Sequence, residues 1–295
     1  MLPWWIVLSL LRTQSNDAPV DTWDYTDTEA WGHRYPLCSG PLQSPIALRK
    51  DEASTAAPPR VVATAAAVEW EVEVRNTGRT IVMNMTYDPR SRETPRQAPI
   101  QLVSQQEPLF GTFDLGEVHF HFGNVSGNPG SVHAIGDRFF DAEVHFVFFD
   151  NSFESNDLAA RVPGGCVVIA IPLNREGRYQ RRQLPFPTLG LERRIEAVSA
   201  RGDYFTYDVN LTNMREMLSV ALRRVYMYSG SLTTPPCNPV VIWFVTAIET
   251  SVNAVFLDRL ITGVYRDRDR RVLMGNNWRP LREKGNRTVY TVQSN

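Results

Sequence analysis

Alternating hydrophobic and polar residues recur in several short segments of this chain and predict β-strands. The segment from Val68 to Met85 alternates on both sides of Asn76-Thr77-Gly78, which is typical of a β-hairpin. Further apolar or alternating runs predict strands at Glu117–Phe122, Glu143–Phe149, Val167–Ile171 and Val240–Ala247. Because Val167–Ile171 is apolar throughout, we expect that strand to be central in a sheet.

Two segments have helical spacing instead. Apolar residues recur every three or four positions from Thr212 to Tyr226. A second helix is predicted to follow Ser251, whose hydroxyl suits an N-cap, and to continue through Leu260. The 295-residue length permits two domains, but single β-rich domains of this size are common.

The composition indicates only that the protein is globular, since 43% of the residues are hydrophobic and 21% are charged. A net charge of −1 at pH 7 gives no reason to expect nucleic acid or an anionic membrane as a partner. The charged run Arg266–Arg271 alternates in sign, so we interpret it as a solvated loop rather than a recognition patch.

The first residues predict secretion. The apolar run Leu2–Leu11 is too short to span a bilayer and suits a signal peptide, although no basic residue precedes it. We therefore expect residues 1–18 to be a signal peptide, residues 19–295 to form the mature domain without a transmembrane helix, and the protein to be secreted or lumenal. Four possible glycosylation sites agree with this, and the sequence leaves open which are used: Asn84, Asn124, Asn210 and Asn286.

The three cysteines predict one disulfide and one remaining thiol. Cys38 and Cys237 each lie beside turn residues, whereas Cys166 lies within an apolar run. The predicted pair is therefore Cys38–Cys237, and Cys166 is expected to be buried in a strand.

Histidines and acidic residues share faces on two of the predicted strands. Glu117, His119 and His121 point to one side of the first strand, because residues two apart share a face. Glu143 and His145 do the same on the second. Three neutral imidazoles with one open position are typical of a catalytic zinc site, and the carboxylates suit partners for the imidazole N–H groups.

A structural role is the alternative for these histidines, since a lone histidine on a half-buried strand more often satisfies itself against its neighbours. The spacing alone leaves both interpretations open. His33 and His133 are outside this strand geometry, and we interpret them as structural.

Several motifs along the chain, taken in order, closely resemble the α-class carbonic anhydrases. The resemblance runs from about Trp23 to Val289 and rests on the aromatic start and on the motifs QSPI, NTG, HFHFG, AEVHF, SLTTPP and NNWRP. It implies a mainly β (α+β) single domain on a large, twisted, mostly antiparallel sheet with short peripheral helices. It also implies Zn²⁺ at the bottom of a conical cleft and reversible hydration of carbon dioxide to bicarbonate and a proton, which is carbonate dehydratase activity.

The resemblance assigns roles to individual residues. His119, His121 and His145 match the zinc ligands, and Glu117 and Glu143 match partners of the first and third ligands. Thr233 matches the hydroxyl that hydrogen-bonds the attacking hydroxide, and Thr234 its neighbour beside the substrate. The cysteine pair matches the disulfide of secreted members. The apolar wall for carbon dioxide is matched by Val147, Val168, Leu232 and Trp243.

Three positions depart from the family pattern. Val132 stands where active members have a glutamate that accepts the proton of the threonine hydroxyl. Arg79 stands where fast members have a proton-carrying histidine, and Glu117 replaces a neutral amide, which is expected to shift activity to higher pH. We therefore expect reduced or moderate turnover. The alternative is a catalytically weak or inactive secreted module with a binding or structural role. The oligomeric state is left open.

Overall fold

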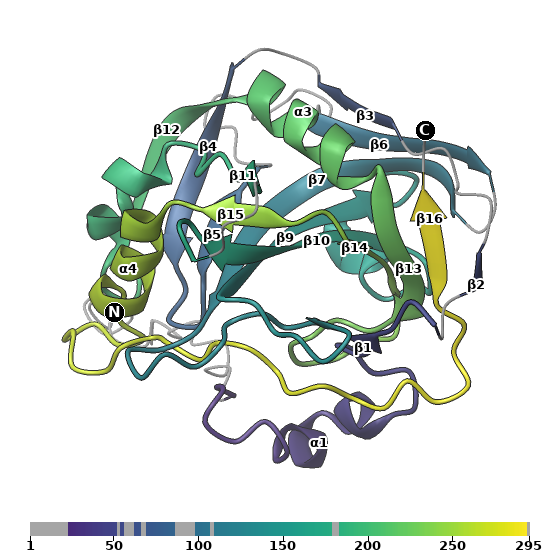
Figure 1. Ribbon diagram of the computed structural model, residues 1–295, viewed down its shortest axis with the longest axis horizontal. Helices are drawn as coiled ribbons and strands as arrows, with labels where there is room; N and C mark the ends of the chain where they lie inside the picture. Colours follow the sequence, from purple (N-terminus) through teal and green to yellow (C-terminus); the bar gives the residue numbers. More distant parts are fainter. Residues whose placement is uncertain are drawn as a thin grey trace, which may run out of the picture.

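A large twisted sheet forms the centre of the protein in this computed structural model, which describes residues 23–51, 54–55, 62–65, 69–85, 98–106, 109–178 and 183–293 (Figure 1). The predicted signal peptide and Val68 lie outside the described residues. Among those residues the sheet has 14 strands, and its main path has the order β12-β4-β5-β7-β9-β10-β14-β13-β16-β2. Its strands are β2 Ser54–Thr55, β3 Val62–Ala65, β4 Glu69–Asn76, β5 Ile81–Asn84, β6 Ile100–Gln106, β7 Leu109–Phe122, β9 Ala142–Asp150, β10 Cys166–Arg175, β11 Leu184–Pro185, β12 Tyr204–Asn210, β13 Arg224–Gly230, β14 Val241–Thr246, β15 Thr250–Val252 and β16 Tyr290–Gln293.

Most neighbouring strands are antiparallel, with parallel pairing between β10 and β14, between β16 and β2, and between β15 and its two neighbours. A separate parallel pair joins β1 Ala47–Leu48 to β8 Ala134–Ile135. The hairpin predicted around Asn76-Thr77-Gly78 is confirmed, since β4 pairs with β5. The predicted fold, a single domain on a mostly antiparallel sheet, is confirmed as well.

Short helices lie around the sheet, with α3 and α4 at its periphery and α1 below it in the view of Figure 1. None of the helices in the described ranges has the length and apolar character needed to span a bilayer. The helices are α1 Trp31–Arg34, α2 Asn156–Ala159, α3 Leu211–Ala221 and α4 Ala254–Gly263, with 3₁₀ turns η1 Pro36–Ser39, η2 Leu191–Arg193 and η3 Ile195–Val198.

Both predicted helix boundaries need correction. The helix predicted to run to Tyr226 ends at Ala221, because the chain from Arg224 pairs with β14 on one side and β16 on the other. Those two ladders satisfy the backbone of a segment whose apolar residues also suited a helix. The second helix begins at Ala254, and its N-cap is Asn253, which accepts from two backbone N–H groups. Ser251 lies in β15 instead.

The two faces of the sheet bury different residues. Val118 and Phe120 of β7 and Phe146 of β9 belong to the main hydrophobic core. Val147 of β9 and Trp243 of β14 belong to a second cluster. Since alternate residues of a strand face opposite sides, His119, His121 and His145 lie on the face away from the main core.

A β-bulge at Gly116 sets which residues of β7 face which side. The pairing of β7 with β9 shifts between Leu115 and Glu117, so that Gly116 is an extra residue. Phe113 and Leu115 before the bulge lie in the main core, as does Val118 after it. A Cβ atom at position 116 would lie 2.5 Å from a ring carbon of Phe149, so any other residue would force that ring to move. The bulge therefore turns the acidic and histidine residues of β7 toward the opposite face.

The predicted cysteine pairing is confirmed. A disulfide joins Cys38 to Cys237 across 199 residues of sequence. Cys166 is a free thiol and is fully buried in β10.

Cys166 is expected to resist alkylation in the folded protein. Burial raises the pKa of its thiol to about 12, so almost no reactive thiolate forms at pH 8. Mass spectrometry after iodoacetamide treatment should find no adduct in the native chain and one adduct in the unfolded, unreduced chain. Rapid labelling of native protein would contradict this, and Cys166→Ala supplies the zero-adduct control.

Candidate metal centre

Three imidazoles meet on the two adjacent strands β7 and β9. His119 lies directly opposite His145 in the antiparallel register, and His121 is two residues further along β7. One nitrogen from each of the three rings lies within 4.8 Å of the others. His121 and His145 are buried, while the side chain of His119 is 15% exposed. The structure thus brings together the three histidines that the sequence singled out.

Hydrogen bonds fix the tautomers of the two buried rings. Nδ1 of His121 lies 2.7 Å from the Asn277 carbonyl oxygen, which only accepts, so this nitrogen carries the proton. Nε2 of His145 likewise donates to Oε1 of Glu143 over 2.7 Å. Burial lowers the pKa of both rings, to about 4 for His145, so each carries a single proton at neutral pH.

The remaining nitrogens of these two rings point lone pairs at each other. Nε2 of His121 and Nδ1 of His145 are 3.2 Å apart, and neither has a proton to donate. Two lone pairs at that distance repel unless a cation lies beside them. A tetrahedral zinc with Zn–N bonds of about 2.0–2.1 Å separates its nitrogen ligands by about 3.3–3.4 Å. The donor geometry therefore suits a zinc ion.

The third ring leaves its Nε2 available in the same way. Nδ1 of His119 lies 2.9 Å from Oε1 of Glu117, whose side chain is 39% exposed. Desolvation would raise the pKa of Glu117, but the hydrogen bond and the electrostatic interaction with His119 outweigh it and lower that pKa. An ionised Glu117 holds the proton of His119 on Nδ1, and the Nε2 lone pair of the same ring is then available to a metal ion.

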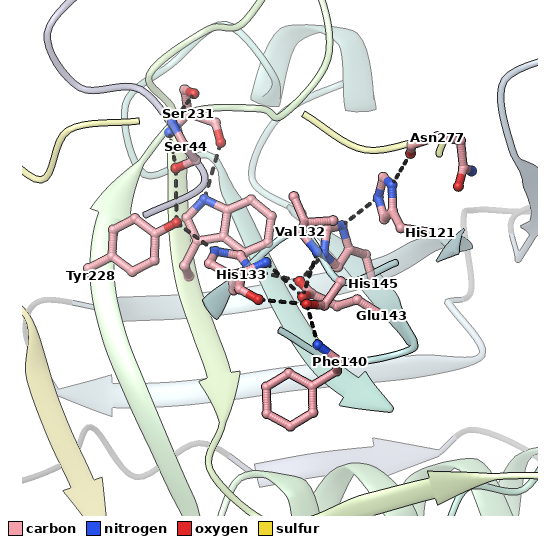
Figure 2. A network of polar contacts seen from close by, with 12 residues as sticks. Ser44, His121, Val132, His133, Phe140, Glu143, His145, Tyr228, Ser231 and Asn277 are labelled. Carbon is pink, nitrogen blue, oxygen red and sulfur yellow. Dashed lines mark hydrogen bonds and ion pairs between the residues drawn. The ribbon is translucent and has the colours of Figure 1, made fainter. Parts of the chain in front are cut away.

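The carboxylate of Glu143 is fully occupied by hydrogen-bond donors (Figure 2). Its Oε2 accepts from the backbone N–H groups of Val132 and His133 at 3.0 and 2.9 Å. Its Oε1 accepts from His133 Nδ1 and His145 Nε2, both at 2.7 Å. Burial would raise the pKa of Glu143, but His133 and these hydrogen bonds hold it well below the usual range. Glu143 is therefore ionised and has no acceptor site left for another group.

His133 is structural, as the sequence predicted, but its role lies within the site. Its Nδ1 bonds Glu143, and its Nε2 lies 2.8 Å from the hydroxyl of Tyr228, which also bonds Ser44. Both ring nitrogens are thus committed, so the cluster His133–Glu143–His145 offers no second metal site although its atoms lie close together. Sequence reasoning missed this network because its members lie up to 184 residues apart.

A cavity of about 250 Å³ opens beside the three histidines. Its wall contains the apolar residues assigned from the resemblance, together with Thr233 and Thr234. Residues that the sequence did not indicate also line it: Tyr25, Phe149, Asn156, Asp157 and Ala160. The cavity has room for a small apolar substrate and a few water molecules, at about 30 Å³ for each water.

The hydroxyl of Thr233 has no protein hydrogen-bond partner among the described residues. Val132, at the position where the resemblance expects a glutamate, is fully buried and supplies only an apolar side chain. Glu143 cannot replace that acceptor, since all of its acceptor sites are used. Hydrogen bonds therefore orient the three candidate ligands, whereas no hydrogen bond in the described part of the chain orients the Thr233 hydroxyl.

The fold and the site define a single-domain β protein with three histidines that could hold a metal ion, beside a partly apolar cavity. The chain belongs to the eukaryotic-type carbonic anhydrase family, whose model matches residues 26–293. This membership supports carbonate dehydratase activity at the level of the family.

Individual relatives agree with this placement. The chain is 27% identical over 300 residues to carbonic anhydrase 12 of Homo sapiens, covering 97% of this chain and 78% of the relative. It is 29% identical over 247 residues to carbonic anhydrase 15 of Mus musculus, covering 78% and 69%. It is also 27% identical to receptor-type tyrosine-protein phosphatase zeta of Homo sapiens over 91% of this chain and 11% of that protein.

Proposed function

We propose that this protein binds Zn²⁺ through His119, His121 and His145 and catalyses the reversible hydration of carbon dioxide with reduced or moderate turnover. The observation that carries the proposal is the pair of facing lone pairs on His121 and His145, 3.2 Å apart. Zinc bound there would supply a hydroxide nucleophile at neutral pH, because zinc lowers the pKa of coordinated water to about 7.

The residues around the ligands have separate roles in this proposal. Val147, Val168, Leu232 and Trp243 form the apolar surface against which carbon dioxide rests, and all four line the cavity. Glu143 and the Asn277 carbonyl keep two imidazoles in the tautomer that binds metal. Glu117 acts likewise on His119, and its negative charge raises the basicity of that ligand. Thr233 and Thr234 offer hydroxyls beside the reacting oxygen.

We also propose that the protein acts in the secretory pathway or outside the cell. The disulfide between Cys38 and Cys237 supports this, since disulfides persist in oxidising compartments. Its substrates would be carbon dioxide and bicarbonate.

Zinc content and stopped-flow carbon dioxide hydration test the proposal together. The purified protein should contain about one zinc per chain and hydrate carbon dioxide above the buffer rate. A chain that stays metal-free in buffered zinc would contradict the proposal. Zinc binding without any hydration would favour the alternative, a binding or structural module on the same scaffold.

Val132→Glu is expected to accelerate hydration by about ten- to a hundredfold, because an orienting hydrogen bond to Thr233 contributes about 1–3 kcal/mol. Stopped-flow rates of the variant and the wild type, each with one zinc per chain, measure the gain. Val132→Met is the matched control, since it adds length without an acceptor. Equal rates for the wild type and Val132→Glu would mean that another group already orients Thr233.

A further inference from the structure

Three aromatic rings near the start of the described chain form one cluster. The rings of Trp23, Tyr25 and Trp31 pack edge to face, with centroids 5.2 to 5.6 Å apart. The indole N–H of Trp31 donates to the Asp24 carbonyl over 2.8 Å, which closes the segment on itself. We call residues 23–31 the aromatic segment. One of its members, Tyr25, lines the cavity beside the histidines.

Arg79 makes two contacts with Trp23 in the part of the chain that the structure describes. Its guanidinium carbon lies 4.0 Å from the centroid of a Trp23 ring, within the range of a cation–π interaction. Its Nε donates to the Trp23 carbonyl oxygen over 3.1 Å. A planar guanidinium makes both contacts at once, whereas a lysine ammonium is a single point charge without this fork.

The backbone of Arg79 is itself tied to the metal centre. The Asn277 side-chain amide donates to the Arg79 carbonyl oxygen over 3.0 Å. The backbone carbonyl of the same asparagine accepts the proton of His121 Nδ1 over 2.7 Å. Asn277 therefore fixes the backbone of Arg79 relative to His121, a candidate metal ligand. The Arg79 side chain, which extends from that backbone, contacts the aromatic segment at Trp23.

We infer that Arg79 is a positioning residue, which clamps the aromatic segment through Trp23 and thereby keeps Tyr25 in the cavity wall. Arg79 does not itself line the cavity. An arginine stays protonated at neutral pH and carries no proton between the cavity and solvent. The side chain at this position thus shapes one wall of the cavity. The inference rests on the proposed function only in treating that cavity as the active site, since the clamp itself needs neither metal nor substrate.

Hydrogen–deuterium exchange of residues 24–35 in the full-length protein tests the clamp. The hydrogen-bonded amides in this stretch include those of Thr26, Ala30 and Tyr35. Arg79→Ala should raise their exchange about tenfold, because a partly buried cation–π contact and a hydrogen bond are lost together. Hydroxyl-radical footprinting should show increased oxidation of Tyr25, which reports on the cavity wall directly.

Arg194→Ala is the matched control. Arg194 stacks on the Tyr207 ring at 4.8 Å and donates to the Gly190 carbonyl over 2.9 Å, so it makes the same two kinds of contact away from the cavity. Its loss should leave residues 24–35 and Tyr25 unchanged. Trp23→Ala removes the cation–π contact and also the ring contacts with Tyr25 and Trp31, so it should raise exchange at least as much as Arg79→Ala. The double variant should fall short of the sum of the two effects, because each single variant already loses the cation–π contact.

Two results would overturn the inference. The first is exchange in Arg79→Ala that stays within twofold of the wild type. The second is complete restoration of protection by Arg79→Lys, because charge alone would then suffice. Partial restoration supports the clamp and also supplies a folded variant if Arg79→Ala is unstable. These readouts use protein without added substrate, so failure of carbon dioxide hydration would count against the proposed function and not against the clamp.

Discussion

Replacing His121 by alanine is expected to abolish both zinc binding and carbon dioxide hydration. The substitution removes one of the two nitrogens whose lone pairs face each other at 3.2 Å. Residues that only orient a ligand typically contribute about 10- to 100-fold to metal affinity, so loss of a ligand should cost more than about a hundredfold. Hydration should fall to at most about 1% of the wild-type rate.

The measurements are zinc content after dialysis against buffered zinc and stopped-flow hydration of wild type beside the variant. His33→Ala is the control, since His33 is an exposed histidine that does not line the cavity. It should retain wild-type zinc content and rate. Equal hydration rates for the wild type and His121→Ala would contradict the proposed enzyme activity. The alternative, a binding or structural module on the same scaffold, would then be favoured.

Glu143→Gln is expected to weaken both the fold and the metal site. Four N–H groups donate to this buried carboxylate. In either orientation, the new NH₂ group of glutamine points at two of these donors. Removing one charge from a buried, hydrogen-bonded network typically costs about 3–5 kcal/mol, so we expect unfolding free energy to fall by about 3 kcal/mol.

The same change releases the tautomer of His145. When the NH₂ group takes the place of Oε1, it lies beside Nε2 of His145 and stabilises the imidazole with its proton on Nδ1, which is the nitrogen that faces His121. That orientation is favoured because the imidazoles can change tautomer, whereas the two backbone N–H groups at Oε2 cannot lose their protons. Zinc affinity should therefore fall about 10- to 100-fold. Urea unfolding of the metal-free proteins and chelator competition for zinc measure the two effects.

The stability difference should also depend on pH. The folded protein holds the pKa of Glu143 well below its ordinary value. The stability from this carboxylate is then complete above about pH 5 and is lost as the pH falls through the lowered pKa. Wild type and Glu143→Gln should therefore converge in acid. Glu216→Gln, at an exposed position of α3, is the control and should match the wild type throughout. A constant difference between pH 7 and pH 3 would contradict the role assigned to Glu143.

Much of the site could be predicted because strand alternation is a local property. Residues two apart on an extended chain share a face whatever the rest of the molecule does. The spacing of His119 and His121 was therefore enough to place them together, and the structure adds His145 directly opposite His119. The disulfide between Cys38 and Cys237 was predicted from the expected oxidising compartment and from the turn residues beside each cysteine. The structure confirms this disulfide. The roles assigned to the two threonines stay predictions.

Local patterns failed where two elements compete for the same residues. The apolar spacing around Val225 and Tyr226 suits a helix as well as a strand, and the ladders with β14 and β16 decided for a strand. The bulge at Gly116 was not predicted at all, because the contact that favours glycine there comes from the ring of Phe149 on the neighbouring strand. Neither partner is near in the sequence.

The sequence by itself determined the fold family, the candidate donor residues and the three departures at Val132, Arg79 and Glu117. The tertiary structure alone decided which nitrogen of each ring is free, because Asn277 and Glu143 fix the protons of His121 and His145. It also decided that Glu143 has no acceptor site left for Thr233. Hydrogen-bond partners depend on which backbone and side-chain groups meet in space, and a carbonyl 156 residues away leaves no local signal in the chain.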